Sequence, residues 1–240
     1  MTPPEWSQAE IGRCVDDVLR SRRAVRAYKP DPVSRDVVLE ILRAAATAPS
    51  ISNSQPWRVY VLTGAPMKAL GDALVEAFRS GNFPPPAHFP DPLPKVFCTR
   101  TDDFAARYYA ALGIDRKDKT ARARQTQRNF SFFGAPVGLI FSIDRRLNAY
   151  SWIDLGLFMQ NVMIAAKARG IGTCPQVSFA RFHEVIASRL GMPPEEVTAC
   201  GMAMGFADTS ANVNQVRMPR EQAEDFVRMV GFEASAELTA

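Results

Sequence analysis

Three arginines stand close together near the start of the chain, in the segment Ser21-Arg22-Arg23-Ala24-Val25-Arg26. Guanidinium groups bind phosphate oxygens through paired hydrogen bonds, and the backbone N–H groups of a turn can add to them. The segment follows a predicted helix, so the residue types and their spacing favour a phosphate clamp. A solvated basic turn is the alternative interpretation of the same residues.

A second segment combines small hydroxyls, an amide and an aromatic, in the order Pro49-Ser50-Ile51-Ser52-Asn53-Ser54-Gln55-Pro56-Trp57. An alanine-rich helical run ends at Pro49, where a glycine or a charged turn is more usual. Such a loop can bring N–H groups close to a flat, polar ligand. A plain connection between a helix and a strand is the alternative.

The motifs of common nucleotide-binding and hydrolytic enzymes are absent. The chain has no Gly-x-Gly-x-x-Gly after a strand, no P-loop, no Gly-x-Ser-x-Gly and no His-Glu-x-x-His. Its two histidines are His88 and His183, and the latter lies at a predicted helix start. Because a nucleophile with an adjacent base is missing, we expect a bound cofactor to carry any chemistry.

The cysteines do not suggest a metal site. They occur singly, without a Cys-x-x-Cys pair, at Cys14, Cys98, Cys174 and Cys200. A zinc site needs clustered Cys and His ligands, so we predict no metal and read the cysteines as small buried hydrophobes.

Composition narrows the class of protein. Of 240 residues, 47% are hydrophobic and 22% are charged, as in ordinary globular proteins. No apolar run approaches the roughly 18–20 residues that span a bilayer, and the N-terminal residues do not resemble a signal peptide, so we expect a cytoplasmic protein with no membrane partner. The net charge of +4 is compatible with a phosphorylated cofactor, an anionic substrate or nucleic acid.

Hydrophobic periodicity predicts most elements. We expect helices over 8–20, from an N-cap at Ser34 to residue 48, over 67–79, within 101–133, over 150–168 and over 182–190, with a possible last helix over 221–230. Strands are predicted over 58–62, 136–143 and 197–205. The helix over 150–168 is apolar almost all round and is predicted to be buried. Strands and helices do not alternate regularly, which favours an α+β fold.

Residues 81–125 differ in character from the rest. Prolines and aromatic residues fill the first part, and a basic stretch from Arg116 to Arg128 follows. The aromatics argue against a free linker, so we expect this region to pack over a surface.

Together these segments resemble the FMN-dependent nitroreductase family, which has an Arg-Arg/His-Ser-x-Arg/Lys stretch followed by a Pro-Ser-x-x-Asn-x-Gln-Pro-Trp loop. Residues 170–176, Gly-Ile-Gly-Thr-Cys-Pro-Gln, are similar to a family loop after the long helix, and residues 205–220 are similar to its Gly-Tyr-Pro-Asp…Arg-x-x-Arg ending. Ala24 departs from a commoner serine, and Phe206 and Ala207 replace Tyr and Pro. The resemblance covers nearly the whole chain except 81–125.

The resemblance implies an α+β, nitroreductase-like fold with a mixed central β-sheet surrounded by helices. It implies one FMN domain over 1–240, with a variable lid around 81–125, and a homodimer with an extended C-terminal tail and flavins at its interface. Cofactor-binding residues are then expected in five segments, as Arg22, Arg23, Ala24, Arg26, Pro49, Ser50, Ile51, Asn53, Arg128, Asn129, Thr173, Cys174, Pro175, Gln176, Arg217 and Arg220. The expected lid residues are Phe83, Phe89, Arg122 and Arg124.

The implied activity is hydride transfer from NADPH or NADH to FMN and then to a nitroaromatic, quinone or similar small-molecule electron acceptor, in a ping-pong cycle without a catalytic side chain. Two alternatives stay open. One is a flavoprotein of the same fold with different chemistry, such as a flavin destructase or a reductive dehalogenase. The other is a nucleic-acid-binding module built on the basic stretch, although we expect no nucleic-acid partner.

Overall fold

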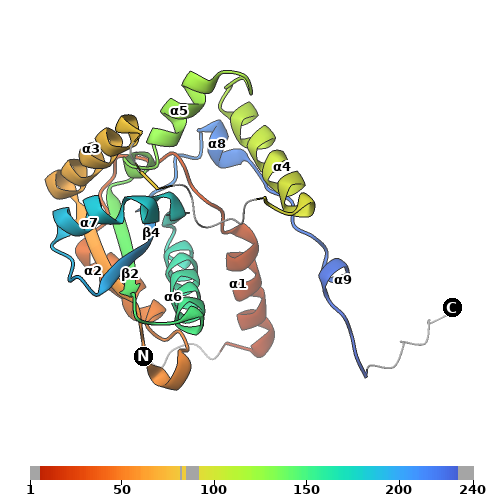
Figure 1. The fold of residues 1–240 in the computed structure, drawn as a ribbon. Helices are drawn as coiled ribbons and strands as arrows, with labels where there is room; N and C mark the ends of the chain where they lie inside the picture. Colours follow the sequence, from red (N-terminus) through yellow and green to blue (C-terminus); the bar gives the residue numbers. More distant parts are fainter. Residues whose placement is uncertain (1–5, 82, 85–91, 232–240) are drawn as a thin grey trace.

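The largely apolar segment that was predicted as a strand over 136–143 lies in the middle of a sheet. In the computed structural model, which describes residues 6–81, 83–84 and 92–231, this segment is strand β2 (Val137–Asp144). It lies between β1 (Arg58–Thr63) and β4 (Glu196–Gly205), and β3 (Gly172–Gln176) completes the order β1-β2-β4-β3 (Figure 1). The expected α+β class is confirmed.

The expectation of a mixed sheet needs correction, because each pair of neighbouring strands is antiparallel. In the described residues, parallel pairing is limited to one isolated bridge between Ala24 and Thr173. The chain leaves β1 at Thr63 and enters β2 at Val137, its direct pairing partner. The long connection between β1 and β2 thus begins and ends at the same end of the sheet, so the two strands run in opposite directions.

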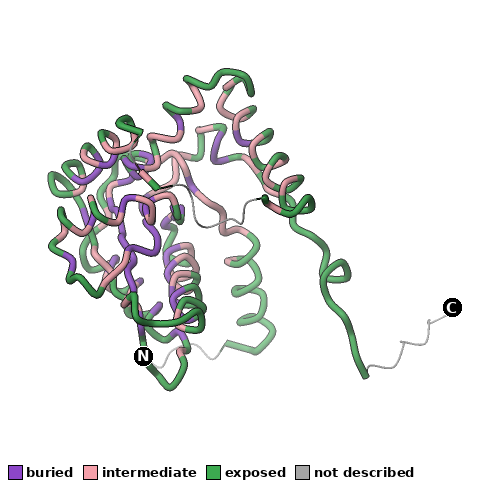
Figure 2. Tube along the Cα trace, viewed as in Figure 1, coloured by how far each residue is buried: buried purple, intermediate pink, exposed green. Residues whose placement is uncertain are grey.

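Helices cover both faces of the sheet. Helices α2 (Arg35–Ala45) and α6 (Ala149–Ala168) pack on one face, and α3 (Gly64–Ser80) and α7 (His183–Leu190) lie on the other (Figure 1). Successive residues of β2 therefore enter different cores: Leu139 packs on the α2–α6 side and Ile140 on the α3–α7 side. Two-sided burial explains why nearly every residue of β2 is apolar, and Figure 2 shows the buried residues concentrated there.

The other elements flank these layers. They are α1 (Gln8–Ser21), the 3-10 turns η1 (Ile51–Asn53), η2 (Phe132–Gly134) and η3 (Val177–Phe182), and the helices α4 (Lys95–Ala111), α5 (Lys119–Gln127), α8 (Asn212–Gln215) and α9 (Ala223–Phe226). The predicted N-cap is confirmed, since the Ser34 side chain accepts a hydrogen bond from the Val37 N–H. An extended tail follows α8, and an ion pair between Arg100 and Glu221 joins it to α4 (Figure 1).

Three predicted elements differ from the structure. Helix α4 begins at Lys95 and not after residue 100, because the last proline, Pro94, lies at its N-cap, where no backbone N–H is needed. The segment 172–176, expected as a loop, is the edge strand β3, where the missing N–H of Pro175 is tolerated. The last helix, predicted over 221–230, is limited to α9. Every residue of 221–230 is exposed, and a helix this short gains too little from its own hydrogen bonds without packing.

The long helix α6 is not buried all round in a single chain. Leu155, Phe158 and Val162 point into the core. Ile153 is 60% exposed and Leu157 is 42% exposed, on the face away from the sheet. The prediction of burial on every side is therefore wrong for one chain alone, because nothing in the described residues covers this face.

Glycines in the strands make room for aromatic rings. A Cβ atom at Gly138 would lie 2.6 Å from the ring of Phe132, and one at Gly201 would lie 2.7 Å from the ring of Phe179. Both rings are fully buried, and they pack against each other with centroids 4.9 Å apart. The usual cost of glycine in a strand is thus offset by close packing of rings on the sheet.

We predict that Gly201→Ala destabilises the protein by about 1–3 kcal/mol, because the new methyl group has to displace the Phe179 ring. The measurement is urea denaturation followed by circular dichroism. Gly12→Ala is the control, since a Cβ at this helical position meets no atom within 4 Å. A Gly201→Ala variant as stable as the wild type would show that the ring moves freely.

Candidate functional site

The arginine segment is held in an extended conformation beside β3. Helix α1 ends at Ser21, and the Val25 N–H then donates to the Thr173 oxygen at 2.9 Å. Because side chains alternate along extended backbone, Arg22 and Arg26 project to one side and Arg23 to the other. The sequence places all three in one clamp, whereas the structure divides them between two sides of the segment.

Arg22 and Arg26 lie near Cys174. Burial lowers the pKa of the Arg22 guanidinium, repulsion from Arg220 lowers it further, and Cys174 acts in the opposite direction. Burial raises the pKa of the Cys174 thiol, and the charges of Arg26 and Arg22 partly offset that rise. The structure thereby places Arg22 and Arg26 near the buried Cys174, and Arg220 near Arg22.

Arg23 lies close to Arg217, in the extended segment that follows α8. Burial lowers the pKa of Arg23, and repulsion from Arg217 adds to the effect. Within the described ranges, none of Arg22, Arg23, Arg26, Arg217 and Arg220 forms an ion pair with a carboxylate. Cations that gather without counter-ions raise the local potential and favour an anionic ligand.

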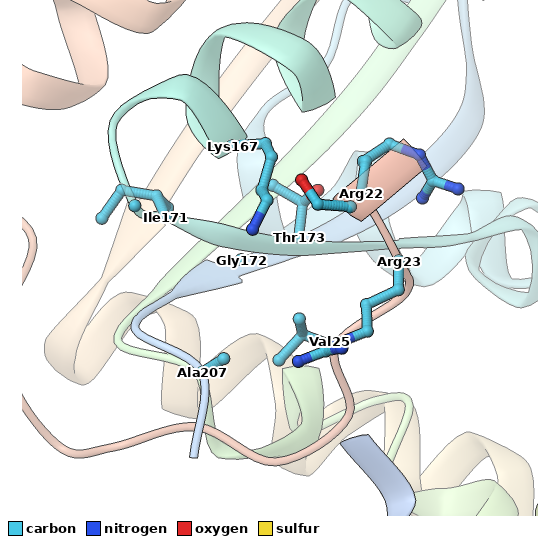
Figure 3. A pocket seen from close by; sticks show the side chains of 10 residues that line it. Arg22, Arg23, Val25, Lys167, Ile171, Gly172, Thr173 and Ala207 are labelled. Carbon is cyan, nitrogen blue, oxygen red and sulfur yellow. The ribbon is translucent and has the colours of Figure 1, made fainter. Parts of the chain in front are cut away.

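A small pocket lies against this segment. It measures about 50 Å³, and its lining includes Arg22, Arg23, Gly172, Thr173 and Lys167 (Figure 3). The amino group of Lys167 lies beside Gly172, while the Arg22 side chain extends away from it. Typical ligand pockets measure roughly 300–1,000 Å³, so this pocket admits a group the size of a phosphate but no complete cofactor.

Lys167 and Asn214 were not predicted from the sequence. Lys167 lies in the last turn of α6, where a basic residue is common and gives no sign of a ligand. Asn214 is buried; its Oδ1 accepts the Arg26 N–H at 2.8 Å, and its Nδ2 donates to the Ala27 oxygen at 2.7 Å. This amide fastens the arginine segment to the tail that carries Arg217 and Arg220.

Gln176 and Asn129, from distant parts of the chain, meet at the end of β3. Gln176 Nε2 donates to the backbone oxygen of Asn129 at 2.7 Å. Among the described residues, the buried Gln176 Oε1 and the Ser178 hydroxyl have no hydrogen-bond partner. An unsatisfied buried polar atom costs about 1–3 kcal/mol, so these atoms favour a ligand or water that supplies partners. The neighbouring Arg128 is exposed, and it donates to the Phe133 oxygen at 3.5 Å.

Among the described residues, the loop over 49–57 has hydrogen bonds to α6 and within itself, but none to the arginine segment. Pro49, Ile51 and Asn53 are exposed, and Ser50 is half-buried. The Ile51 N–H donates to the carboxylate of Asp154 on α6. In the part of the chain that the structure describes, no hydrogen bond or ion pair joins this loop to 22–26.

The residues expected to form a lid differ in their burial and in their contacts. Phe83 packs against the α3–α7 core, where Arg181 lies over its ring at 4.4 Å, which favours a structural role. Arg122 lies over the Tyr109 ring at 4.8 Å, and Arg124 is exposed. Phe89 falls outside the described residues.

Helix α4 contacts the arginine segment through aromatic rings that the sequence analysis did not identify. The Arg26 guanidinium lies 5.0 Å from the ring centroid of Tyr108 and 5.6 Å from that of Phe104. The Tyr108 hydroxyl accepts a hydrogen bond from Gln125 of α5 at 2.7 Å. The two helices of the expected lid region are thus joined to the candidate site.

Neither a metal set nor a membrane span is found among the residues that can be described. No three His, Cys, Asp or Glu side chains gather there as candidate ligands. No helix in those ranges is both long and apolar enough to cross a bilayer.

Comparisons with known proteins agree with the resemblance seen in the sequence. The model of the Nitroreductase family matches residues 19–206. A 4-nitrobenzoate reductase of Pseudomonas putida is 48% identical over 218 residues, which cover 91% of this chain and 96% of the relative. A nitrobenzene nitroreductase of Ectopseudomonas oleovorans is 44% identical over 219 residues, covering 90% and 96%. The structure of the FMN-dependent nitroreductase NfnB from Mycobacterium smegmatis in complex with NADPH superposes with a TM-score of 0.87 at 32% identity, covering 92% of this chain and 99% of that one.

The buried thiols yield a test of this environment. Burial raises the pKa of Cys200 to about 12, against a weaker lowering by a backbone hydrogen bond from Gln176. Cys14 is exposed in a single chain, so the expectation of a buried thiol is wrong there. Only the thiolate reacts with iodoacetamide, so we predict that Cys174 and Cys200 are labelled at pH 8 far more slowly in native protein than in urea-unfolded protein. Mass spectrometry after timed quenching measures this, and labelling of Cys174 at equal rates in the two states would contradict the packing described.

Proposed function

The chain belongs to the nitroreductase family, and from that premise we propose that it is an FMN-dependent oxidoreductase that uses NADPH to reduce nitroaromatic compounds. The observation that carries the proposal is the group of arginines without carboxylate partners beside a pocket the size of a phosphate. Two relatives that match over 96% of their length are named for nitrobenzoate and nitrobenzene, which favours this acceptor class over the two alternatives. NADPH is preferred over NADH because NfnB binds it.

The residues present fit FMN. The phosphate would be held by Arg22 and Arg26 on one side of the segment or by Arg23 on the other, with Lys167 at the pocket wall. Arg220 lies near Arg22 and Arg217 near Arg23, so the tail would add positive charge on either side. The segment Thr173–Gln176 would lie against the flavin ring with Asn129, and the unpartnered Gln176 Oε1 would accept a hydrogen bond there. Bound FMN supplies the electron transfer, while these side chains bind and orient it and exclude water.

The nucleic-acid alternative has less support. Arg116 faces Asp102 at 3.5 Å, and Arg122 lies over Tyr109. Part of the basic stretch is thus occupied by contacts within the lid region. Phe89, Arg122 and Arg124 stay a proposal for acceptor choice, whereas the packing of Phe83 favours a structural role for that residue. Phe104 and Tyr108 join the proposal through their contact with Arg26.

A homodimer is part of the proposal. Helix α1 has no buried residue, yet Ile11, Val15 and Leu19 form an apolar stripe along one side of it. A single 14-residue helix gains little stability without packing. Burial of this stripe and of the exposed face of α6 against a second copy would supply it. The second copy would also bring its Pro49–Asn53 loop, since the pocket in one chain is too small for the whole cofactor.

We propose further that residues 1–240 act as one FMN domain in the cytoplasm. The family model spans most of the described chain. All four cysteines are free, as is usual in a reducing compartment.

We predict that Arg22→Ala weakens FMN binding by about 10- to 100-fold, because loss of one charged donor to a phosphate costs roughly 1.5–3 kcal/mol. Fluorescence titration of the apoprotein with FMN measures the dissociation constant. Arg43→Ala removes an exposed arginine of α2 and serves as the control. Equal affinity of the Arg22→Ala variant and the wild type would remove Arg22 from the phosphate site.

We predict that Val15→Glu combined with Ile153→Glu converts the dimer to a monomer, because two carboxylates would be buried in an apolar interface. Light scattering should then give the chain mass of 26.5 kDa, and FMN should be lost with the dimer. Val96→Glu, at an exposed apolar position of α4, is the control. A wild type that is monomeric with full FMN content would contradict the proposal.

A further inference from the structure

Asp154 is a buried carboxylate in the middle of an apolar helix. It is 4% exposed and is the one acidic residue of α6. Among the residues that the structure describes, no Lys, Arg or His forms an ion pair with it. Burial of an unpaired carboxylate is unfavourable, so a specific interaction has to account for its position.

That interaction reaches the loop over 49–57. The Ile51 N–H donates to Asp154 Oδ2 at 3.1 Å. The loop is strained, because three non-glycine residues adopt left-handed backbone: φ is 49° at Ser52, 56° at Asn53 and 46° at Gln55. Conformations of this kind cost free energy and persist only where the surroundings impose them.

The other hydrogen bonds of the loop stay within it. The Asn53 N–H donates to the Ser50 oxygen, the Ser54 N–H to the Ile51 oxygen, and the Gln55 N–H to Ser50 Oγ. For the described residues, the bond to Asp154 is thus the only hydrogen bond between Pro49–Pro56 and the rest of the fold.

Helix α6 also holds the far end of the loop. The Trp57 ring stacks on that of Phe158, with centroids 4.7 Å apart and planes 5° from parallel. Phe158 lies one helical turn after Asp154. The same side of α6 therefore fixes both ends of the strained segment, through a charge at one end and an aromatic stack at the other.

We infer that Asp154 is a positioning residue that holds the Pro49–Asn53 loop in the conformation that meets the flavin. This inference rests on the proposed function, in which the loop lines the FMN held by a second copy. Its neighbours Ile153 and Leu157 lie on the exposed face of α6. Asp154 thereby joins the proposed contact between subunits to the loop that completes each flavin site.

The test compares Asp154→Leu, which removes the acceptor, with Asp154→Asn, which keeps an acceptor without the charge. A charge-assisted bond is the stronger of the two. We expect amide hydrogen exchange over 50–55 in the apoprotein to rise at least 10-fold in Asp154→Leu and at least threefold in Asp154→Asn. Asn161→Ala is the matched control, since Asn161 lies on the same helix and donates to Ala45 of α2 at 3.5 Å; it should leave this exchange unchanged.

Flavin affinity supplies a second readout. Asp154→Leu should weaken FMN and riboflavin binding by the same factor, of at least fivefold, because the loop meets the ring. Arg22→Ala should weaken FMN alone, because riboflavin has no phosphate. Unchanged exchange over 50–55 in Asp154→Asn overturns the inference even if Asp154→Leu fails to fold, and so do unchanged affinities in a folded Asp154→Leu. A wild type that binds no FMN refutes the proposed function, while the exchange experiment still tests the anchor.

Discussion

One backbone hydrogen bond, from the Val25 N–H to the Thr173 oxygen, aligns the two segments on which the candidate site depends. The approach is so close that a Cβ at Gly172 would lie 2.7 Å from the Val25 side chain. On the opposite edge, Lys29 N–H donates to the Phe206 oxygen and Asp208 N–H to the Ala27 oxygen. The backbone of the arginine segment is therefore held on both sides, by β3 and by the residues after β4, which keeps the Cα atoms of the three arginines close together.

This clamping explains the electrostatic character of the site. The arginines of both segments are held near one another by backbone and by the Asn214 amide, although their charges repel. In a protein without ligand, that repulsion opposes folding locally. An anion that binds there removes repulsion and adds hydrogen bonds, so its contribution to stability exceeds that of a comparable surface contact.

Elements that depend on local pattern could be predicted from the sequence, and residues that depend on distant partners could not. The N-cap residue Ser34 and the helical spacing of Val38 and Ile41 predicted α2. Because β2 is buried on both faces, its residues are mostly apolar, and this run of apolar residues predicted the strand. The strand β3 was not visible, because its pairing with β4 is non-local and Pro175 suggests a loop. Lys167, Asn214 and Asp154 were overlooked for the same reason: an isolated polar residue in a helix gives no sign of the segment that folding brings to it. The exposed apolar face of α6 was predicted to be buried because hydrophobicity alone does not distinguish a core position from a position that a second copy would cover.

The bare surface of α1 has a consequence for the order in which the molecule forms. Its residues leave the ribosome well before α6, yet in a single chain none of them is fully buried. The two cores on the sheet contain no residue of α1. If a second copy covers the apolar stripe, α1 gains most of its packing only on association, and each newly made subunit first exists with a packed centre and a poorly packed first helix. That state exposes Ile11, Val15 and Leu19 together, so its lifetime, set by the concentration of subunits, governs how much of the newly synthesised protein is open to aggregation and proteolysis.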